Sequence, residues 1–193
     1  MASSSRAAAY AAAVPPPGER PHSIAVFGCT GNAGRAVAYH VIKSAAARDP
    51  SDGFVFRVAL SGRNRDKVQR VLNGVLDELR DEGANADGVD VSIVVADASD
   101  DGSMLDLAQS SSVLVSCAGP FGRYGEAAIR ACVECGTHYV DITGEVPWVT
   151  RMIGEYGARA EGAGVALCPF AGYDCVPAEL GMWLVGGALG SGG

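Results

Sequence analysis

The fold is decided by residues 24–34, which read IAVFGCTGNAG. The first four residues form a short apolar run that ends at a glycine, a pattern typical of a buried strand. Three glycines follow at G-x-x-G-x-x-G spacing, which permits a tight turn and lets backbone amides approach phosphate groups. An ordinary glycine-rich turn is the alternative. We predict a strand, a phosphate-binding loop and a helix, with a binding site formed by Gly28, Thr30, Gly31, Asn32, Ala33 and Gly34.

Strands and helices alternate along the rest of the chain. Short apolar runs predict further strands at residues 55–60, 91–95, 113–116, 138–142 and 165–168. Alternation of this kind requires parallel pairing with right-handed crossovers, and strands that are apolar throughout are expected when both sheet faces are covered. We therefore predict an α/β fold, a doubly wound parallel sheet of the Rossmann type with about six strands.

The helices are predicted from apolar residues at helical spacing. After the first helix, this spacing indicates helices near residues 68–79, 104–108, 127–133 and 147–156. Gly136 is expected to end the helix near residues 127–133. The first helix is expected to bury a face formed by Ala33, Ala36, Val37, His40 and Val41. The fifth is expected to bury Val149, Met152, Ile153 and Tyr156.

The end of the second strand indicates which dinucleotide binds. NAD enzymes usually place a carboxylate there for the ribose 2′-hydroxyl, whereas this chain has Ser61-Gly62-Arg63-Asn64-Arg65. A guanidinium suits a ribose 2′-phosphate through charge-assisted hydrogen bonds. We predict NADP(H) as the cofactor and Arg63 as a binding residue; the alternative is that Arg63 and Arg65 are solvated loop charges.

Two other strand ends supply candidate binding residues. Asp97 closes the third strand, where it either contacts the adenine end of the cofactor or caps the following helix. Gly119 and Pro120 follow the fourth strand, where a small turn lets the nicotinamide half pass close to the backbone; a plain turn is the alternative. Asp141, Glu145 and Asp174 also follow strands, but no residue is assigned to catalysis, because a dinucleotide cofactor itself supplies the chemistry.

Composition excludes several classes of protein. The chain has 193 residues, 48% hydrophobic and 19% charged, so it can build a sizeable core and is not disordered throughout. Its net charge of -7 would repel a phosphate backbone, which argues against nucleic acid as a partner. The sequence contains no stretch of about 20 apolar residues, so we predict no helix that spans a membrane.

The chain has six cysteines, and the sequence shows no secretory signal. We therefore expect reduced thiols in a cytoplasmic protein. Cys132 and Cys135 have redox-motif spacing but are expected to be core residues, and no metal site is predicted. Cys29, in the glycine loop, is the thiol expected to be most reactive. Tyr39 and Lys43 match the spacing of a short-chain dehydrogenase pair, but on the wrong helix for that chemistry.

Several segments together resemble the saccharopine-dehydrogenase-like oxidoreductases, including the trans-acting enoyl reductases. The similarity covers about residues 23–181, and its most specific segments are Thr137–Glu145 and Tyr173–Gly181. The resemblance implies an NADP-binding Rossmann domain that packs against a second, substrate-binding domain. It also implies a small-molecule or lipid-linked substrate, and an association of some relatives with lipid droplets or membranes.

The resemblance and composition together suggest three parts. Residues 1–21 are rich in Ala, Ser and Pro and are expected to be a flexible tail, with organelle targeting as a weak alternative. Residues 22–181 form the dinucleotide-binding domain. Residues 182–193 are expected to begin a missing second domain or to be a frayed tail. We expect a domain that binds NADP(H) but is poorly active alone; the alternative is a non-catalytic or lipid-surface-associated module.

Overall fold

The computed structural model of the chain describes residues 15–49, 51, 53–86 and 88–190. Its centre is a six-stranded sheet with the order β3-β2-β1-β4-β5-β6, and every neighbouring pair is parallel. The strands are β1 His22–Phe27, β2 Arg57–Gly62, β3 Asp90–Val95, β4 Ser111–Ser116, β5 His138–Asp141 and β6 Leu167–Cys168. The chain starts at the centre, winds out to β3, and returns past β1 to wind out to β6. The predicted doubly wound fold is confirmed.

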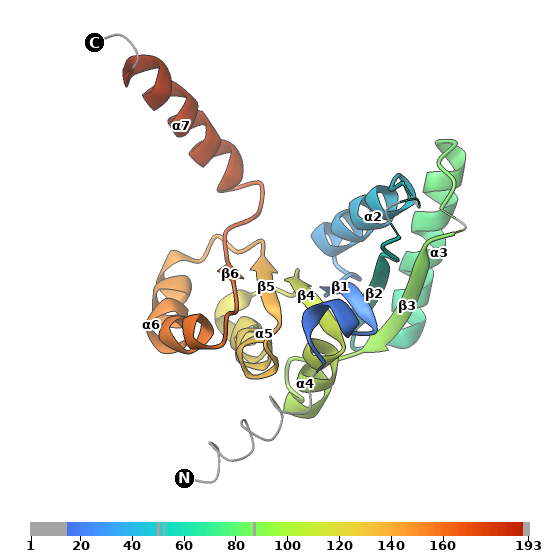
Figure 1. Cartoon of the computed structure of the whole chain (residues 1–193), viewed down its shortest axis with the longest axis horizontal. Helices are drawn as coiled ribbons and strands as arrows, with labels where there is room; N and C mark the ends of the chain where they lie inside the picture. Colours follow the sequence, from blue (N-terminus) through green and yellow to red (C-terminus); the bar gives the residue numbers. More distant parts are fainter. Residues whose placement is uncertain (1–14, 50, 52, 87, 191–193) are drawn as a thin grey trace.

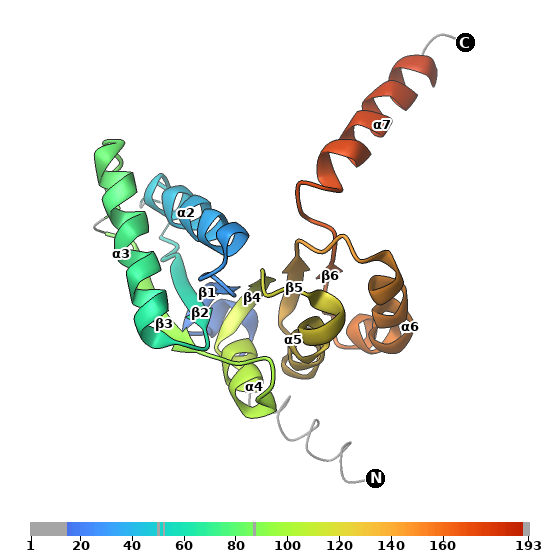
Figure 2. The same ribbon diagram turned by 180° about the vertical axis from the view of Figure 1, so that it is seen from behind.

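Helices cover both faces of the sheet (Figures 1 and 2). On one face, α2 (Asn32–Ala46) and α3 (Arg65–Asp81) pack on Val26, Val58 and Leu60. On the other face lie α4 (Asp101–Gln109), α5 (Phe121–Cys135) and α6 (Val146–Gly162), which share a core with Ala25, Ala59 and Leu114. Alternate residues of one strand thus enter opposite cores, as the twofold repeat of a strand requires.

Two strands begin two residues later than the sequence predicts. The ladder between β2 and β3 starts at the pair Arg57–Asp90, so Val55 has no strand partner and is 62% exposed. Val165 lies in the turn that follows α6, where its backbone N–H donates to the Ala160 carbonyl at 2.8 Å and not to a neighbouring strand. Strand β6 consequently holds only Leu167–Cys168.

The buried face of α2 differs from the predicted one. Gly34, Ala38 and Ile42 are buried, whereas Ala33, Ala36 and His40 are exposed. The cause is the close approach of Gly34 to the glycine loop: a Cβ added there would lie 2.2 Å from the Gly28 carbonyl oxygen. This contact turns the helix so that the face containing Gly34 meets the sheet.

The other helices follow their predicted patterns more closely. Helix α5 ends at Gly136, whose φ of +65° is left-handed, as expected for a glycine just after a helix. Cys132 and Cys135 are buried in the core on this helix, as predicted. Helix α6 carries Pro147 in its first turn, but Ile153 is 60% exposed and Trp148 takes a buried place that the predicted stripe missed.

The segment just before β1 is packed against the domain, which corrects part of the tail expected over residues 1–21. Pro17–Glu19 form a short 3-10 helix, η1, and Arg20 is only 3% exposed. The Arg20 guanidinium donates to the carbonyls of Ser111 and Cys135 at 2.6 and 2.7 Å. It also donates to the Thr137 hydroxyl at 2.5 Å. Residues 1–14, with the targeting alternative, lie outside the described residues.

Helix α7 (Val176–Gly190) points away from the rest of the domain (Figures 1 and 2). It is apolar yet exposed: Met182 and Trp183 are 75% and 74% accessible, and Leu184 is 63% accessible. Residues 182–190 therefore continue a helix and are not frayed, while residues 191–193 lie outside the described part. Among the described residues, no helix combines the length and the apolar character needed to cross a membrane.

Candidate cofactor-binding site

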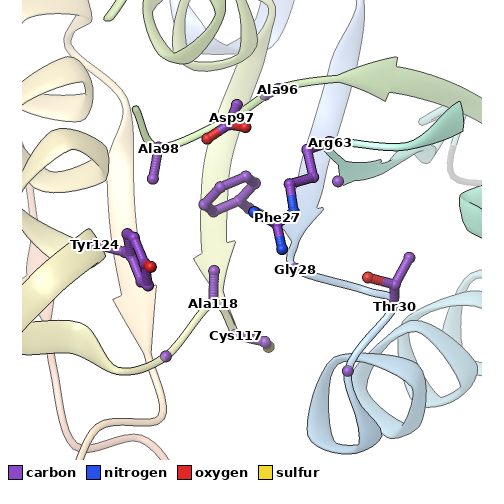
Figure 3. Close-up of a pocket in the computed structure, with 13 residues that line it drawn as sticks. Phe27, Gly28, Thr30, Arg63, Ala96, Asp97, Ala98, Cys117, Ala118 and Tyr124 are labelled. Carbon is purple, nitrogen blue, oxygen red and sulfur yellow. The ribbon is translucent and has the colours of Figure 1, made fainter. Parts of the chain in front are cut away.

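A cleft of about 250 Å³ lies at the carboxyl ends of β1–β4 (Figure 3). This is where the strand order reverses between β1 and β4, the usual place for a ligand in an open parallel sheet. Six of the predicted site residues line it: Gly28, Thr30, Gly31, Arg63, Asp97 and Gly119. The structure thus brings together residues from four different strand ends.

The glycine loop has no room for side chains at two of its three glycines. Gly28 has a φ of +79°, and a Cβ added there would lie 2.8 Å from the Ala118 backbone nitrogen. Gly34 contacts the loop from the first turn of α2 and does not line the cleft. Gly31 is different, because its φ is -83° and an added Cβ would meet only the Gly28 carbonyl oxygen, at 3.6 Å. The backbone geometry therefore does not require a glycine at position 31. Space for a bound ligand is the remaining reason for one.

The amino terminus of α2 faces the solvent beside the cleft. Among the described residues, no side chain caps this helix, and its first turn contains no acidic residue. Asn32 and Ala33 are exposed in that turn. Unpaired N–H groups together with the helix dipole favour an anion at such a terminus. Asn32 and Ala33, which do not line the cleft with their side chains, can still offer backbone N–H groups to a phosphate.

The two arginines after β2 have different surroundings. Arg63 lines the cleft, and its side chain extends from the strand end toward the glycine loop (Figure 3). Arg65 begins α3, and its Nη1 lies 3.4 Å from the Ile93 carbonyl oxygen. The following helix is capped by Asn64, which accepts from the Lys67 backbone N–H. Arg63 is therefore the guanidinium placed to meet a ligand.

Asp97 lines the cleft but does not cap the following helix. Its carboxylate accepts hydrogen bonds from the Ser99 backbone N–H and hydroxyl at 2.9 and 2.8 Å, and these bonds, with a smaller effect of Arg63, lower the pKa of Asp97. The cap of α4 is Asp100, which accepts from the Gly102 backbone N–H. Of the two alternatives left open by the sequence, capping is excluded and a place in the cleft is found.

The turn after β4 holds Gly119 in the cleft and Pro120 just outside it. The peptide bond between them is cis, and Pro120 precedes the first residue of α5. Glu145 closes this helix terminus: its carboxylate accepts from the Phe121 and Gly122 backbone N–H groups at 2.8 and 2.9 Å. The Glu145 carboxylate thus already occupies the amino terminus of α5. At the amino terminus of α2, by contrast, no side chain of the described residues forms a cap.

Asp141 has a structural position. It is buried at the end of β5, where its carboxylate accepts from the Tyr139 hydroxyl at 2.9 Å and from the Thr143 backbone N–H at 3.0 Å. It also accepts from the Phe170 backbone N–H, which ties the exit of β6 to β5. Burial raises the pKa of this carboxyl. Asp174 lies beyond this exit, near Gly144.

The structure also corrects the expectation for Cys29. This thiol is fully buried, and burial raises its pKa to about 11, so it is not a reactive thiolate. Tyr39 and Lys43 lie on α2, where both contact the Glu82 carboxylate and neither lines the cleft. This agrees with the interpretation of that pair as a coincidence of spacing.

Seven residues that line the cleft were not singled out from the sequence. They are Phe27, Gly62, Ala96, Ala98, Cys117, Ala118 and Tyr124. Most are small residues adjacent to a predicted site residue, so a wider window at each strand end identifies them. Tyr124 lies in a helix, four residues after Pro120, and only the packing of α5 brings it to the cleft.

Comparison with known proteins places this fold in a family. A sequence model described as the saccharopine dehydrogenase NADP binding domain matches residues 24–168. A saccharopine dehydrogenase-like oxidoreductase of Mus musculus is 32% identical over 164 residues, which cover 85% of this chain and 37% of the relative. The trans-acting enoyl reductase of Mycobacterium bovis is 32% identical over 86% of this chain and 36% of its own.

Two further similarities concern location and structure. A lipid droplet localized protein of Caenorhabditis elegans is 32% identical over 83% of this chain and 35% of its own. The saccharopine dehydrogenase (L-Glu forming) of Saccharomyces cerevisiae has a TM-score of 0.55 at 17% identity, over 80% of this chain and 28% of that one, which supports the fold. The chain spans about a third of the length of the curated relatives it matches.

The residues present fit NADP(H), the cofactor of the matching family. The close approaches at Gly28 and Gly34 leave a loop that carries no side chain at these two positions, and Arg63 places a guanidinium in the same cleft. The end of β2 offers no carboxylate between Ser61 and Arg65 that would repel that phosphate. The chain therefore belongs to the saccharopine dehydrogenase NADP-binding domain family.

Proposed function

We propose that this chain binds NADPH in preference to NADH and serves as the cofactor-binding part of an oxidoreductase acting on a small-molecule or lipid-linked substrate. The observation that carries the proposal is the placement of Arg63 and the glycine loop in one cleft. The loop from Gly28 to Gly31 and the first turn of α2 would hold the diphosphate, and Arg63 the 2′-phosphate. When bound, NADPH supplies a hydride to a substrate.

We propose that the residues of this chain position the cofactor and give little turnover by themselves. Asp97 is ionised and already bonded to Ser99, so it orders its loop and is a poor proton donor. Asp141 is buried among Tyr139, Thr143 and Phe170, and Glu145 is engaged by α5. These three carboxylates are all engaged in hydrogen bonds within the domain, so none is free to act on a substrate. Catalysis of this kind also depends largely on holding the substrate close to the cofactor.

A titration of reduced-nicotinamide fluorescence tests cofactor preference. We expect the wild-type chain to bind NADPH more tightly than NADH. Arg63→Ala should weaken NADPH about tenfold or more and leave NADH nearly unchanged, because a charge-assisted contact is worth roughly 1.5–3 kcal/mol. Arg65→Ala is the matched control and should alter neither. Equal losses for both dinucleotides in Arg63→Ala would refute the assignment.

Turnover is tested by following the loss of reduced-nicotinamide absorbance with enoyl thioesters, aldehydes and imines. Turnover of several per second by this chain alone would contradict the proposal that it gives little turnover by itself. Binding of NADPH without turnover is the expected result.

Helix α7 favours a second candidate function, attachment to a lipid surface. Its apolar side chains are exposed along the helix, and it has a single acidic residue, Glu179, in its first turn and no basic residue in its last. A 32%-identical relative is a lipid droplet localized protein. We propose that α7 enters the apolar layer beneath a phospholipid monolayer, with the rest of the domain on the cytoplasmic side.

Flotation with phospholipid-coated triolein droplets tests this attachment. The wild-type chain should float with the droplets, and a chain with Trp183→Glu and Leu184→Glu should stay in the dense fraction. Arg151→Glu, at an exposed position on α6, is the control for added negative charge. If the double variant floats as well as the wild type, α7 is not the attachment site.

A further inference from the structure

Tyr124 occupies a side of the cleft that the phosphate-binding residues do not use. It lies in the first turn of α5, where its backbone N–H donates to the Pro120 carbonyl at 3.1 Å, so its position is fixed by the helix. The ring is half-buried and lines the cleft across from Arg63 and Thr30 (Figure 3). The guanidinium carbon of Arg123 lies 5.2 Å from the ring centroid.

The position of Arg63 indicates which part of a dinucleotide reaches Tyr124; this step rests on the proposed function. A ribose whose 2′-phosphate meets Arg63 carries the adenine on its neighbouring carbon, so the base must lie within one sugar of that arginine. The cleft beside Arg63 is lined by Ala96, Asp97 and Ala98, which follow β3. Arg63 is close enough to Asp97 to affect its pKa.

The walls of this part of the cleft suit a flat aromatic base. Ala98 and Ala118 present only methyl groups, and Tyr124 presents a ring (Figure 3). Helices α4 and α5 pack against one another, which holds the loop containing Ala98 and the turn containing Tyr124 at a fixed separation. Bases bind to such surfaces by stacking and by edge contacts with aromatic side chains.

We infer that Tyr124 forms the aromatic wall of the adenine subsite, opposite Arg63. The ring makes the contact, and Arg123 lies against the ring and restrains it by a cation–π contact. The glycine loop then holds the diphosphate, Arg63 the 2′-phosphate and Tyr124 the base.

The test uses a fragment that has the adenine and the 2′-phosphate but no nicotinamide. Binding of 2′,5′-ADP by calorimetry and of NADPH by fluorescence is measured for the wild type, Tyr124→Phe, Tyr124→Ala and Phe54→Ala. Phe54 lies at the opposite, amino-terminal edge of the sheet, so Phe54→Ala is the control for loss of an aromatic ring. Tyr124→Ala should weaken both ligands by the same factor, about five- to tenfold. Tyr124→Phe should stay within about twofold of wild type, because it keeps the ring.

Different failures have different meanings. A loss in Tyr124→Ala for NADPH but not for 2′,5′-ADP would assign the ring to the nicotinamide half and overturn the inference. An unchanged affinity for both ligands would also overturn it while leaving the proposed function intact. A wild-type chain that binds neither ligand would refute the proposed function itself. If circular dichroism shows that Tyr124→Ala is misfolded, Tyr124→Leu replaces it, since leucine keeps bulk but not the ring, and should show the same loss.

Discussion

Glu145 and Phe121 join the two loops that follow β4 and β5. The Glu145 carboxylate accepts from the Phe121 backbone N–H at 2.8 Å and from the next N–H, that of Gly122, at 2.9 Å. A side chain from a distant loop thus satisfies two of the four N–H groups that a helix terminus leaves unpaired. The same bonds hold the Gly119-Pro120 turn beside the cofactor cleft.

Loss of this contact should destabilise the fold. We expect Glu145→Ala to lower the free energy of unfolding by about 1 kcal/mol, the usual value of a helix cap, and Glu145→Gln to lower it less, because one acceptor remains. Urea denaturation followed by circular dichroism measures the change. Glu155→Ala, on the exposed side of α6, is the control. Equal stabilities of Glu145→Ala and Glu155→Ala would show that the cap contributes nothing.

The glycine loop offers three substitutions that separate folding from binding. In Gly34→Ala the new Cβ would lie 2.2 Å from the Gly28 carbonyl oxygen, so backbone must move, at a cost of about 1–3 kcal/mol. In Gly31→Ala the nearest atom is at 3.6 Å and φ is -83°, so the fold should be unaffected. Gly31→Val should likewise fold, and abolish NADPH binding because its branched side chain stands where the diphosphate would lie. Thermal melting and NADPH titration of the three variants check this, and NADPH binding by folded Gly31→Val would contradict it.

Arg20 should be important for stability although it precedes the first strand. Its guanidinium donates to carbonyls at the ends of α4 and α5, where a cation also meets the negative end of the helix dipole. Arg20→Ala removes the guanidinium donor from the Ser111 and Cys135 carbonyls, and we expect a loss of about 3 kcal/mol in unfolding free energy. Arg20→Lys should recover only part of it, since an ammonium cannot reproduce the fork geometry. Chemical denaturation, with exposed Arg151→Ala as the control, measures both; full stability in Arg20→Lys would mean that charge alone matters.

The thiols should differ in reactivity, and the reaction of the buried thiols should become faster as the pH rises. Burial raises the pKa of Cys29 and Cys135 to about 11 and that of Cys117 to about 12. At pH 8 about one in a thousand molecules or fewer has such a thiol ionised, and the fraction rises tenfold with each pH unit. Iodoacetamide should therefore modify exposed Cys168 first, and NADPH should slow the modification of cleft-lining Cys117 but not of Cys168. Peptide mass spectrometry gives the rates; early modification of Cys29 would contradict this order.

The fold could be predicted from the sequence because its signals are local. Each strand is a short apolar run, and the turn at Gly28 and the helix end at Gly136 each need a glycine for a reason visible in the residues themselves. The buried face of α2 could not be predicted this way. Apolar residues occur on two sides of that helix, and the choice between them depends on the contact of Gly34 with the loop.

The site residues could be predicted where they lie at the ends of strands, and could not where packing of a helix decides their place. Residues at strand ends, such as Arg63 and Asp97, were found because the carboxyl ends of parallel strands meet at one edge. Tyr124 was missed because its place depends on how α5 packs. Arg20 was missed because composition made its segment look like a tail, whereas six hydrogen bonds from one guanidinium fix it to residues 15, 108, 111, 135, 136 and 137.

Arg20 also bears on the order in which the molecule assembles. Its partners beyond the neighbouring segment lie 88 to 117 positions further along the chain, so these bonds form only after α4, β4 and α5 have come together. Closing so long a loop costs chain entropy before any contact is gained. Contacts that form after the rate-limiting barrier affect the rate of unfolding and leave the rate of folding almost unchanged. We therefore expect Arg20→Ala to speed unfolding more than it slows folding, which stopped-flow measurements of both rates would check.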